Sequence, residues 1–349
     1  MRVLILYTEL AGYVLGNFKR FLDLNSEAQM LVVHYPVNPE APFNFNSFDK
    51  AEFVEFNENS ISTIAKKVID FNPDIVLCSG WGNKHYIQWV KSLRPDTKRV
   101  ICFDNQWKAS LKQIILSTIS KFTFLKMFSY AWVPGLPQRT YALKLGFKSE
   151  NIFTGLYPAD SELFKSVGMK KLSLQTEYPK VFLSVARYIP QKDLPTMWEA
   201  FIEANNDMGN LWTMKCIGFG EDYDKRIINP FIAHLGFKQP SEMENDVLNA
   251  GVYVLPSIYE PWGVAVHEMA LSALPMVLSD KVGAATMFLN KSNGFSFSAG
   301  DKAQLKAVFK TIMALSDQQL WDMAGASHKS GLQLSSDNWA NTLTTILEN

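Results

Sequence analysis

Short apolar runs alternate with segments of helical periodicity along most of the chain. In the first part of the sequence, runs that are typical of buried strands cover 3–7, 29–35, 74–79 and 99–103. Amphipathic patterns between these runs predict helices over 14–24, 61–71 and 86–93. Residues 36–50, with three prolines and three asparagines, have no periodicity and predict a loop. This alternation predicts a parallel sheet with helices on both faces.

A second series of the same kind follows residue 178. Its apolar runs predict strands over 180–186, 212–217, 252–255 and 275–279. Helical patterns cover 194–205, 241–249, 264–272 and 302–315. The stretch 157–179 mixes prolines, a glycine and polar residues, which favours a linker between two α/β units. The chain ends in a helix-like segment with Trp339, Leu343, Ile346 and Leu347 on one face.

Composition and charge agree with a two-domain globular protein. The chain has 349 residues, and about 150 residues per domain is typical. Its 34 lysines and arginines balance its 34 aspartates and glutamates, which argues against a nucleic-acid partner. Cys78, Cys102 and Cys216 are too widely spaced for a disulfide framework or a zinc cluster, so we expect buried thiols in a reducing compartment. The first residues lack the features of a signal peptide, and no apolar run reaches the roughly 20 residues of a membrane-spanning helix.

The densest cluster of candidate functional residues follows the predicted strand at 252–255. Glu260 lies in the loop after this strand, and Glu268 lies one to two turns into the helix that begins near Gly263. Carboxylates accept paired hydrogen bonds from sugar hydroxyls, and the free N–H groups at the start of a helix favour a bound phosphate. Two isolated glutamates in a turn and a helix are more often solvated, so their spacing alone leaves both interpretations open.

A second cluster follows the predicted strand at 180–186. Arg187 comes directly after this strand, and Lys192 follows a turn that contains Pro190. Two cations at the end of one strand can bind a diphosphate and stabilise its charge as it leaves. A solvated pair of cations is the ordinary alternative for this spacing.

Together, these two clusters resemble the motifs of the retaining glycosyltransferases of family 4, the glycosyl transferases group 1. The two glutamates match that family's E-x7-E pattern, and the strand at 274–279 resembles the family's strand that follows it. The resemblance covers nearly the whole chain, and its specificity rests on residues 181–295. It implies that Glu260 holds hydroxyls of the donor sugar and that Glu268 holds the ribose.

The same resemblance implies further donor contacts. Gly263 and Val264 would offer backbone amides to the diphosphate or the sugar, and Arg187 and Lys192 would bind the phosphates as catalytic groups. Gly218 lies in a Gly-x-Gly turn like the one after the second strand of the family's nucleotide domain, although an ordinary turn would look the same.

Two more positions and the fold itself follow from the resemblance. Phe237 lies in a segment like the one whose backbone faces the base, and Gly12 resembles a glycine loop near the phosphates, with one glycine of the usual pair. The resemblance implies an α/β protein of the GT-B fold, with two Rossmann-like domains that face each other across a cleft. We expect an N-terminal acceptor-side domain over 1–160, joined by a C-terminal helix at about 335–349, and a nucleotide-sugar-binding domain over 161–334.

The first domain departs from the family pattern, because the histidine that many members place near the donor sugar is missing. The loops after the two strands that would precede it carry Trp81, Asp104 and Asn105 instead. We expect Asp104 or Asn105 to take the place of the histidine, with Asp104 as the catalytic candidate. Trp81 and Asn105 are candidates for the acceptor side.

The segment 107–132 is basic and rich in large apolar residues. From Asn105 to Ser149 there are seven basic residues and no acidic residue, with Lys108 and Lys112 near the start. A basic helix with aromatic residues favours contact with the inner leaflet of a membrane, or with a lipid-diphosphate acceptor. A core-facing helix with solvated lysines explains the pattern equally well.

The resemblance implies a retaining transfer of a sugar from a nucleotide-diphospho-sugar to a hydroxyl of a glycan or a lipid-linked acceptor, in bacterial surface-polysaccharide or lipid-linked glycan assembly. No cofactor besides the donor substrate is expected, and no metal, since Asp222 and Asp224 fall in a loop that we interpret as surface. We expect the protein in the cytoplasm or peripheral on the inner membrane. Two alternatives stay open: a non-catalytic nucleotide-sugar-binding partner subunit, and a GT-B sugar-nucleotide epimerase.

Overall fold

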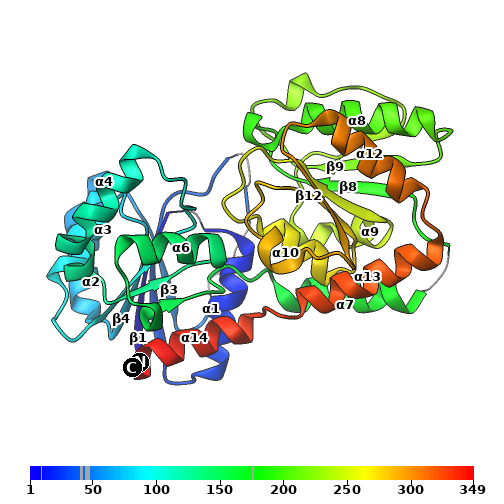
Figure 1. Cartoon of the computed structure of the whole chain (residues 1–349). Coiled ribbons are helices and arrows are strands. Elements are labelled where there is room, and N and C mark those ends of the chain that lie inside the picture. The colour runs from blue at the N-terminus through cyan, green and yellow to red at the C-terminus, as the bar shows by residue number, and fades with distance from the viewer. Residues whose placement is uncertain (9, 40–41, 44–47, 175–176) are drawn as a thin grey trace. The chain divides into compact units, whose positions relative to one another are not determined.

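The computed structural model describes residues 1–8, 10–39, 42–43, 48–174 and 177–349 (Figure 1). The chain folds into two compact units. Unit 1 comprises Met1–Asn38, Phe43–Pro158 and Ser335–Asn349, and unit 2 comprises Pro39–Pro42 and Ala159–Leu334. The last segment of the chain therefore belongs to the same unit as the first residues.

Unit 1 is built on a sheet of seven strands in the order β3-β2-β1-β4-β5-β6-β7, in which every pair of neighbours is parallel. The strands are β1 (Arg2–Tyr7), β2 (Gln29–His34), β3 (Ala51–Glu55), β4 (Ile75–Ser79), β5 (Lys98–Cys102), β6 (Tyr130–Trp132) and β7 (Ile152–Phe153). The helices are α1 (Gly12–Leu24), α2 (Ile61–Phe71), α3 (Lys84–Ser92), α4 (Leu111–Ile119), α5 (Phe124–Met127), α6 (Leu136–Leu145) and α14 (Ser336–Glu348). Single 3-10 turns occur at Glu58–Ser60, Ser120–Phe122 and Ser149–Asn151.

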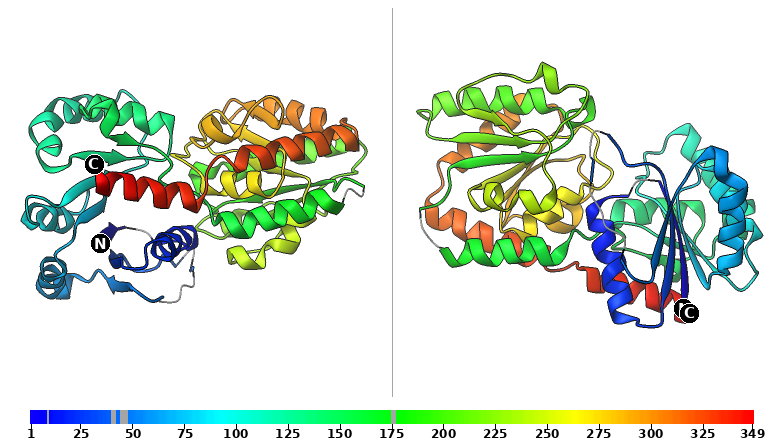
Figure 2. Two further views of the ribbon diagram at one scale, coloured as in Figure 1. Left: turned by 90° about the horizontal axis from the view of Figure 1, so that it is seen from below. Right: turned by 180° about the vertical axis from the view of Figure 1, so that it is seen from behind.

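Both faces of this sheet are buried, which explains why its central strands are apolar at almost every position. Val3 and Ile5 of β1 point to the face that α1 and α14 cover, where Trp339 of α14 stacks on Trp132 with ring centroids 5.1 Å apart. The intervening Leu4 of β1 points to the face covered by α2, α3 and α6. Figure 2 shows α14 running beside α1, so the C-terminal helix completes the core of unit 1.

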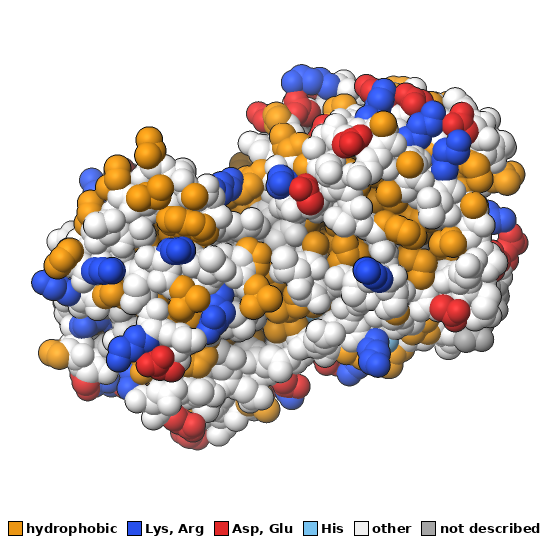
Figure 3. Space-filling view, in the orientation of Figure 1, with side chains coloured by type: hydrophobic (Ala, Val, Ile, Leu, Met, Phe, Trp, Pro, Cys, Tyr) orange, Lys and Arg blue, Asp and Glu red, His pale blue; other side chains and the backbone are white. Residues whose placement is uncertain are grey.

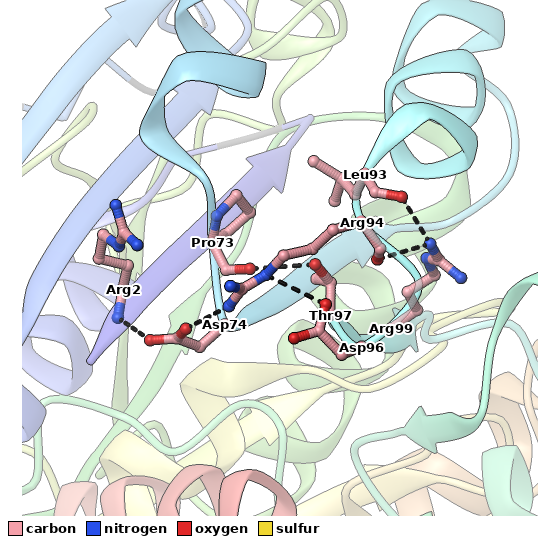
Figure 4. Close-up of polar contacts among 8 residues, drawn as sticks. All are labelled: Arg2, Pro73, Asp74, Leu93, Arg94, Asp96, Thr97 and Arg99. Atoms are coloured by element: carbon pink, nitrogen blue, oxygen red, sulfur yellow. Dashed lines mark hydrogen bonds and ion pairs between the residues drawn. The ribbon is translucent and has the colours of Figure 1, made fainter.

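The amino-terminal edge of this sheet is closed by a polar cluster around Asp74, directly before β4 (Figure 4). One carboxylate oxygen of Asp74 accepts a hydrogen bond from the backbone N–H of Arg2 at 2.8 Å, and the other pairs with the guanidinium of Arg94 at 2.5 Å. Arg99 donates to the carbonyl oxygens of Leu93 and Arg94, at 2.9 and 3.0 Å. The cluster joins β1, β4 and β5 at the edge opposite to the carboxyl ends of the strands.

Unit 2 repeats the architecture with six parallel strands in the order β10-β9-β8-β11-β12-β13. The strands are β8 (Val181–Val185), β9 (Thr213–Ile217), β10 (Ile232–His234), β11 (Val252–Leu255), β12 (Met276–Ser279) and β13 (Gly294–Phe297). The helices are α7 (Ser161–Leu174), α8 (Leu194–Asp207), α9 (Glu244–Leu248), α10 (Val264–Leu271), α11 (Ala285–Phe288), α12 (Lys302–Met313) and α13 (Asp317–Gly331). Further 3-10 turns are η4 (Pro190–Lys192), η5 (Tyr223–Lys225) and η6 (Pro240–Glu242).

Helices again cover both faces of the unit-2 sheet. Figure 1 shows α8 and α12 on one face, and α7, α10 and α13 on the other. The core under α8 and α12 is aromatic, since Phe182 of β8 packs against Phe201, Trp212 and Phe309. The prediction of two parallel α/β sheets is confirmed, and the three cysteines are free and buried, as expected.

The structure corrects one sequence interpretation. The stretch 157–179, predicted as a linker, contains the helix α7. The apolar pattern of α7 is broken by two residues on its buried side, Gly168 and Lys171. A side chain at Gly168 would place Cβ 2.0 Å from the carbonyl oxygen of Leu271, and Lys171 reaches inward to bond backbone carbonyl oxygens of the α9–β11 connection. The loop predicted at 36–50 lies partly outside the described residues, and its described residues form no helix or strand.

Candidate functional site

In unit 2 the predicted donor residues converge on the carboxyl edge of the sheet. Strands β9, β8 and β11 are neighbours and run parallel, so the loops that follow them leave the sheet side by side. Arg187 and Lys192 follow β8, Gly218 follows β9, and Glu260 follows β11. This edge is where parallel α/β sheets bind their ligands.

The clearest contact at this edge joins Lys192 and Glu260. The ammonium group of Lys192 forms an ion pair and hydrogen bond with Oε2 of Glu260, and both side chains are largely shielded from water. The backbone supports the pair, because the N–H of Ile258 donates to the carbonyl oxygen of Gln191 at 2.9 Å. Two residues that are 68 positions apart in the sequence are therefore brought into direct contact.

The loop after β11 is held in place around Glu260. The backbone N–H of Glu260 donates to the carbonyl oxygen of Lys281 at 3.3 Å, and its carbonyl oxygen accepts from the N–H of Gly283 at 3.0 Å. The hydroxyl of Ser257 lies 3.5 Å from Oε2 of Glu260. A carboxylate on a backbone fixed at both ends is well suited to hold a ligand in one orientation.

Gly263 allows α10 to begin directly beside this carboxylate. Its φ of +95° lies in the left-handed region, where a glycine is strongly favoured. A side chain there would also place Cβ 3.1 Å from Cγ of Glu260. Among the described residues no side chain caps the start of α10, so the first N–H groups of the helix, beginning at Val264, can serve an anionic ligand.

Glu268 lies on α10 and is half-buried. Its loss of hydration and the nearby charge of Asp160 raise the pKa of this carboxyl from 4.5 to about 7. Glu260 and Glu268 both act on the buried Tyr253 of β11, whose phenol pKa is raised first by burial and then by these two charges. Both carboxylates of the E-x7-E pair therefore act on the same phenol of β11.

The turn after β9 contacts the turn after β8 without room for side chains. Gly218 has φ +142°, and Cβ at this position would lie 1.9 Å from the carbonyl oxygen of Ala186. The N–H of Gly218 donates to the carbonyl oxygen of Gly236 at 2.8 Å. Phe237, the next residue, is half-buried in the same group of loops. The structure thus brings all the predicted donor residues of unit 2 to one edge of the sheet.

His267, next to Glu268, is a structural residue. Its ring stacks on Phe288 with centroids 4.5 Å apart, and the backbone N–H of Ala159 donates to its Nδ1 at 2.9 Å. Its Nε2 donates to the carbonyl oxygen of Gly331 at 2.9 Å. Burial lowers the pKa of His267 to about 4, so the imidazole is neutral at pH 7. Through these two hydrogen bonds, His267 of α10 holds residues near both ends of the segment Ala159–Leu334.

In unit 1 the predicted residues also follow the carboxyl ends of strands. Trp81 follows β4 and packs against Phe103 and Phe124, with ring centroids 5.4 and 5.3 Å apart. Asp104 and Asn105 follow β5, and Asp104 is half-buried while Asn105 is exposed. Gly12 is the first residue of α1, directly after the loop that follows β1.

Lys108 and Lys112 lie further along the same connection and are exposed. Lys108 precedes α4, and its backbone N–H donates to Oε1 of Gln113 at 2.7 Å. Lys112 is the second residue of α4. Lys112 therefore belongs to the solvent-facing helix, whereas Lys108 lies in the loop between β5 and α4 that also carries Asp104.

A cluster of tyrosines near Asp104 escaped the sequence analysis. Tyr7, Tyr13 and Tyr157 act on one another electrostatically, and burial followed by the charge of Asp104 raises the pKa of the Tyr157 phenol. The rings of Tyr13 and Tyr157 meet edge to face at 6.0 Å. These residues come from three separate segments, so no spacing in the sequence could have revealed them.

The described part of the chain contains no group of three or more His, Cys, Asp or Glu side chains placed to hold a metal ion. Asp222 is instead paired with Lys225 within η5. The chemistry available at the unit-2 edge is that of cations, carboxylates and helix N–H groups.

Comparison with known proteins finds a family that matches part of unit 2. Residues 169–323 match the family described as Glycosyl transferases group 1. No curated protein matches the sequence.

Among solved structures, the fold is similar over the whole chain. HepE from Anabaena in complex with UDP and glucose has a TM-score of 0.73 and 14% identity, with 100% of this chain and 99% of that chain covered. A mutant of S. aureus TarM in complex with fondaparinux, alpha-GlcNAc-glycerol and UDP has a TM-score of 0.72 and 10% identity, with full coverage of both chains. Sucrose-phosphate synthase from Thermosynechococcus elongatus has a TM-score of 0.71 and 14% identity, covering 100% of this chain and 98% of that chain. At these identities the likeness shows the fold, which is GT-B with two Rossmann-like units.

Proposed function

We propose that this glycosyltransferase moves a sugar from a nucleotide-diphospho-sugar to a hydroxyl of a glycan or lipid-linked acceptor. The match of residues 169–323 to the glycosyl transferases group 1 and the GT-B fold support this proposal. The observation that carries the proposal is the contact between Lys192 and Glu260 at the carboxyl edge of the unit-2 sheet. A cation for the phosphates and a carboxylate for sugar hydroxyls are held there side by side.

The proposed donor site uses the residues of this edge. Arg187 and Lys192 bind the diphosphate and stabilise the negative charge that develops as the sugar departs. Glu260 accepts hydrogen bonds from hydroxyls of the donor sugar, and the N–H groups at Gly263 and Val264 serve the diphosphate or the sugar.

Glu268, Gly218 and Phe237 complete the proposed donor site. Glu268 accepts hydrogen bonds from the ribose hydroxyls, and these bonds are strongest when both of its oxygens are acceptors, in the ionised form. Gly218 keeps the turn after β9 clear of side-chain atoms, and the backbone at Phe237 faces the base. UDP is a reasonable first nucleotide to test, because HepE and TarM have been solved with UDP bound.

Unit 1 is proposed to bind the acceptor. Asp104 is the proposed catalytic residue. It follows β5 together with Asn105, while Trp81 follows β4 and Gly12 begins α1. The reaction is proposed to retain the anomeric configuration and to need no metal, as is typical of the family. Surface-polysaccharide or lipid-linked glycan assembly in the cytoplasm, or at the inner membrane, is the proposed setting.

The test is donor hydrolysis and binding across a panel of nucleotide sugars. Wild type should release nucleotide slowly from one donor, and Arg187→Ala and Glu260→Ala should lose this activity. Lys180→Ala is the matched control, since Lys180 is an exposed cation directly before β8, at the opposite end of the strand from Arg187. Binding to no donor would contradict the proposal and would favour a partner-subunit role.

A further inference from the structure

The helix α4 presents an apolar stripe to solvent instead of to the core. Leu111, Ile114, Ile115 and Ile119 recur at helical spacing and are all exposed, and Phe122 continues the stripe into the next turn. Leu111 is 80% exposed and Phe122 is 71% exposed. An amphipathic helix in a soluble protein normally buries such a stripe.

The opposite side of α4 is the one that packs on unit 1. Leu116 packs against the core, and the buried Ser120 donates a hydrogen bond to the carbonyl oxygen of Leu145 at 2.6 Å. At about 100° per residue, Leu116 and Ser120 lie roughly 125° and 165° around the helix from the centre of the exposed stripe. The orientation of α4 is therefore settled by its packing, and the stripe has no partner among the described residues of unit 1. Figure 3 shows apolar side chains exposed over the part of unit 1 where Figure 1 places α4.

The charges around the stripe are all positive. Lys112, Lys121 and Lys126 are exposed on α4, the turn at Ser120–Phe122 and α5, and Lys108 is exposed in the loop before α4. No acidic residue occurs between Asn105 and Ser149. At about 100° per residue, Lys112 and Lys121 fall on the two sides of the stripe. Apolar side chains flanked by lysines are the arrangement of helices that lie in the interface of an anionic bilayer.

From this arrangement we infer that α4 and the turn after it form a docking surface for an anionic phospholipid membrane. The surface consists of Leu111, Ile115, Ile119 and Phe122, which insert among the lipids, and of the flanking lysines, which meet the headgroups. A second copy of the chain fits less well, because it would bring like charges together. A free glycan fits less well, because aliphatic side chains offer its hydroxyls no partners. No helix in the described part of the chain could cross the bilayer, so the contact is with the surface.

This inference rests on the proposed function and narrows the acceptor. Leu111 follows Asn105 closely in the sequence, so the docking surface begins beside the carboxyl edge of the unit-1 sheet. Docking of α4 would place this edge near the headgroup layer. The acceptor class that suits this position is a lipid-linked one.

The test is co-sedimentation of the full chain with lipid vesicles. Wild type is expected to sediment with vesicles of phosphatidylcholine and phosphatidylglycerol, and to stay in solution with phosphatidylcholine alone. Added salt should release it, because exposed charges are screened. The double variant Ile115→Ser with Phe122→Ser should partition at least about tenfold more weakly, since it removes inserted apolar groups. The pair Lys112→Gln with Lys121→Gln should weaken binding and flatten its salt dependence.

Leu211→Ser is the matched control, because Leu211 is a 68% exposed apolar residue of unit 2, two residues before β9. This variant should bind as wild type does, and circular dichroism should show all variants folded. Wild type that stays in solution with anionic vesicles would overturn the inference, as would variants that bind unchanged. A wild-type dimer in sedimentation velocity that the Ile115/Phe122 variant loses would instead identify a second copy as the occupant. Nucleotide release measured without vesicles tests the proposed function separately.

Discussion

The raised pKa of Glu268 gives a prediction that can be measured without any substrate. The change is Glu268→Gln, which keeps the shape of the side chain and removes its charge. In the folded chain the carboxyl has a pKa of about 7, against 4.5 for an ordinary glutamate. The folded state therefore binds this proton more tightly than the unfolded state does. Stability from the protonated form is fully present below pH 4.5 and is lost as the pH rises through 7.

The size of the effect follows from the two pKa values. A rise of the pKa from 4.5 to about 7 corresponds to roughly 3 kcal/mol of unfolding free energy. Between pH 5 and pH 8 the wild-type chain should lose roughly 2 to 3 kcal/mol of unfolding free energy through this group, and the variant should not. The neighbouring His267 changes in the opposite direction, because its pKa is lowered to about 4. Its contribution is common to both chains, so it cancels when variant and wild type are compared at each pH.

The assay is urea unfolding at several pH values between 5 and 8, with wild type and Glu268→Gln in parallel. Relative to wild type, the variant should gain roughly 2 to 3 kcal/mol of unfolding free energy as the pH rises across this range. Glu221→Gln removes an exposed carboxylate of the same unit and is the control. A difference between Glu268→Gln and wild type that stays constant from pH 5 to 8 would refute the reasoning. Donor affinity should also rise with pH through about 7 in wild type, since the ionised carboxylate is the stronger hydrogen-bond acceptor for the ribose hydroxyls.

Three further predictions concern the stability of the two units. Trp339→Ala should destabilise unit 1 by about 3–5 kcal/mol, because Trp339 is buried and stacks on Trp132; a thermal melt measures this, and a loss under 1 kcal/mol would contradict it. Gly218→Ala should lower the stability of unit 2 by roughly 3 kcal/mol or more, since its Cβ would overlap the carbonyl oxygen of Ala186; urea unfolding that matches wild type would be inconsistent with this geometry. Asp74→Ala should cost about 1 kcal/mol in unit 1, because its ion pair is partly exposed; added salt should reduce the loss in a denaturant titration.

The sequence patterns predict the central strands of both sheets better than the short edge strands. Strands buried on both faces read as plain apolar runs, so the central strands of both sheets could be predicted to within about two residues. The short edge strands β7 and β10 could not, because strands of two or three residues carry too few positions to show a period. The helix α7 was missed because its buried side contains a glycine and a lysine.

The sequence by itself determined the parallel α/β architecture, the residue types at the donor site and the basic, apolar character of residues 107–132. These are local properties, since periodicity and motif spacing are written along the chain. Only the tertiary structure decided which residues meet. The contact of Lys192 with Glu260, the tyrosines around Asp104 and the pKa of Glu268 all depend on segments far apart in the sequence. The orientation of α4 was also settled there, because packing through Leu116 and Ser120 turns its apolar stripe outward.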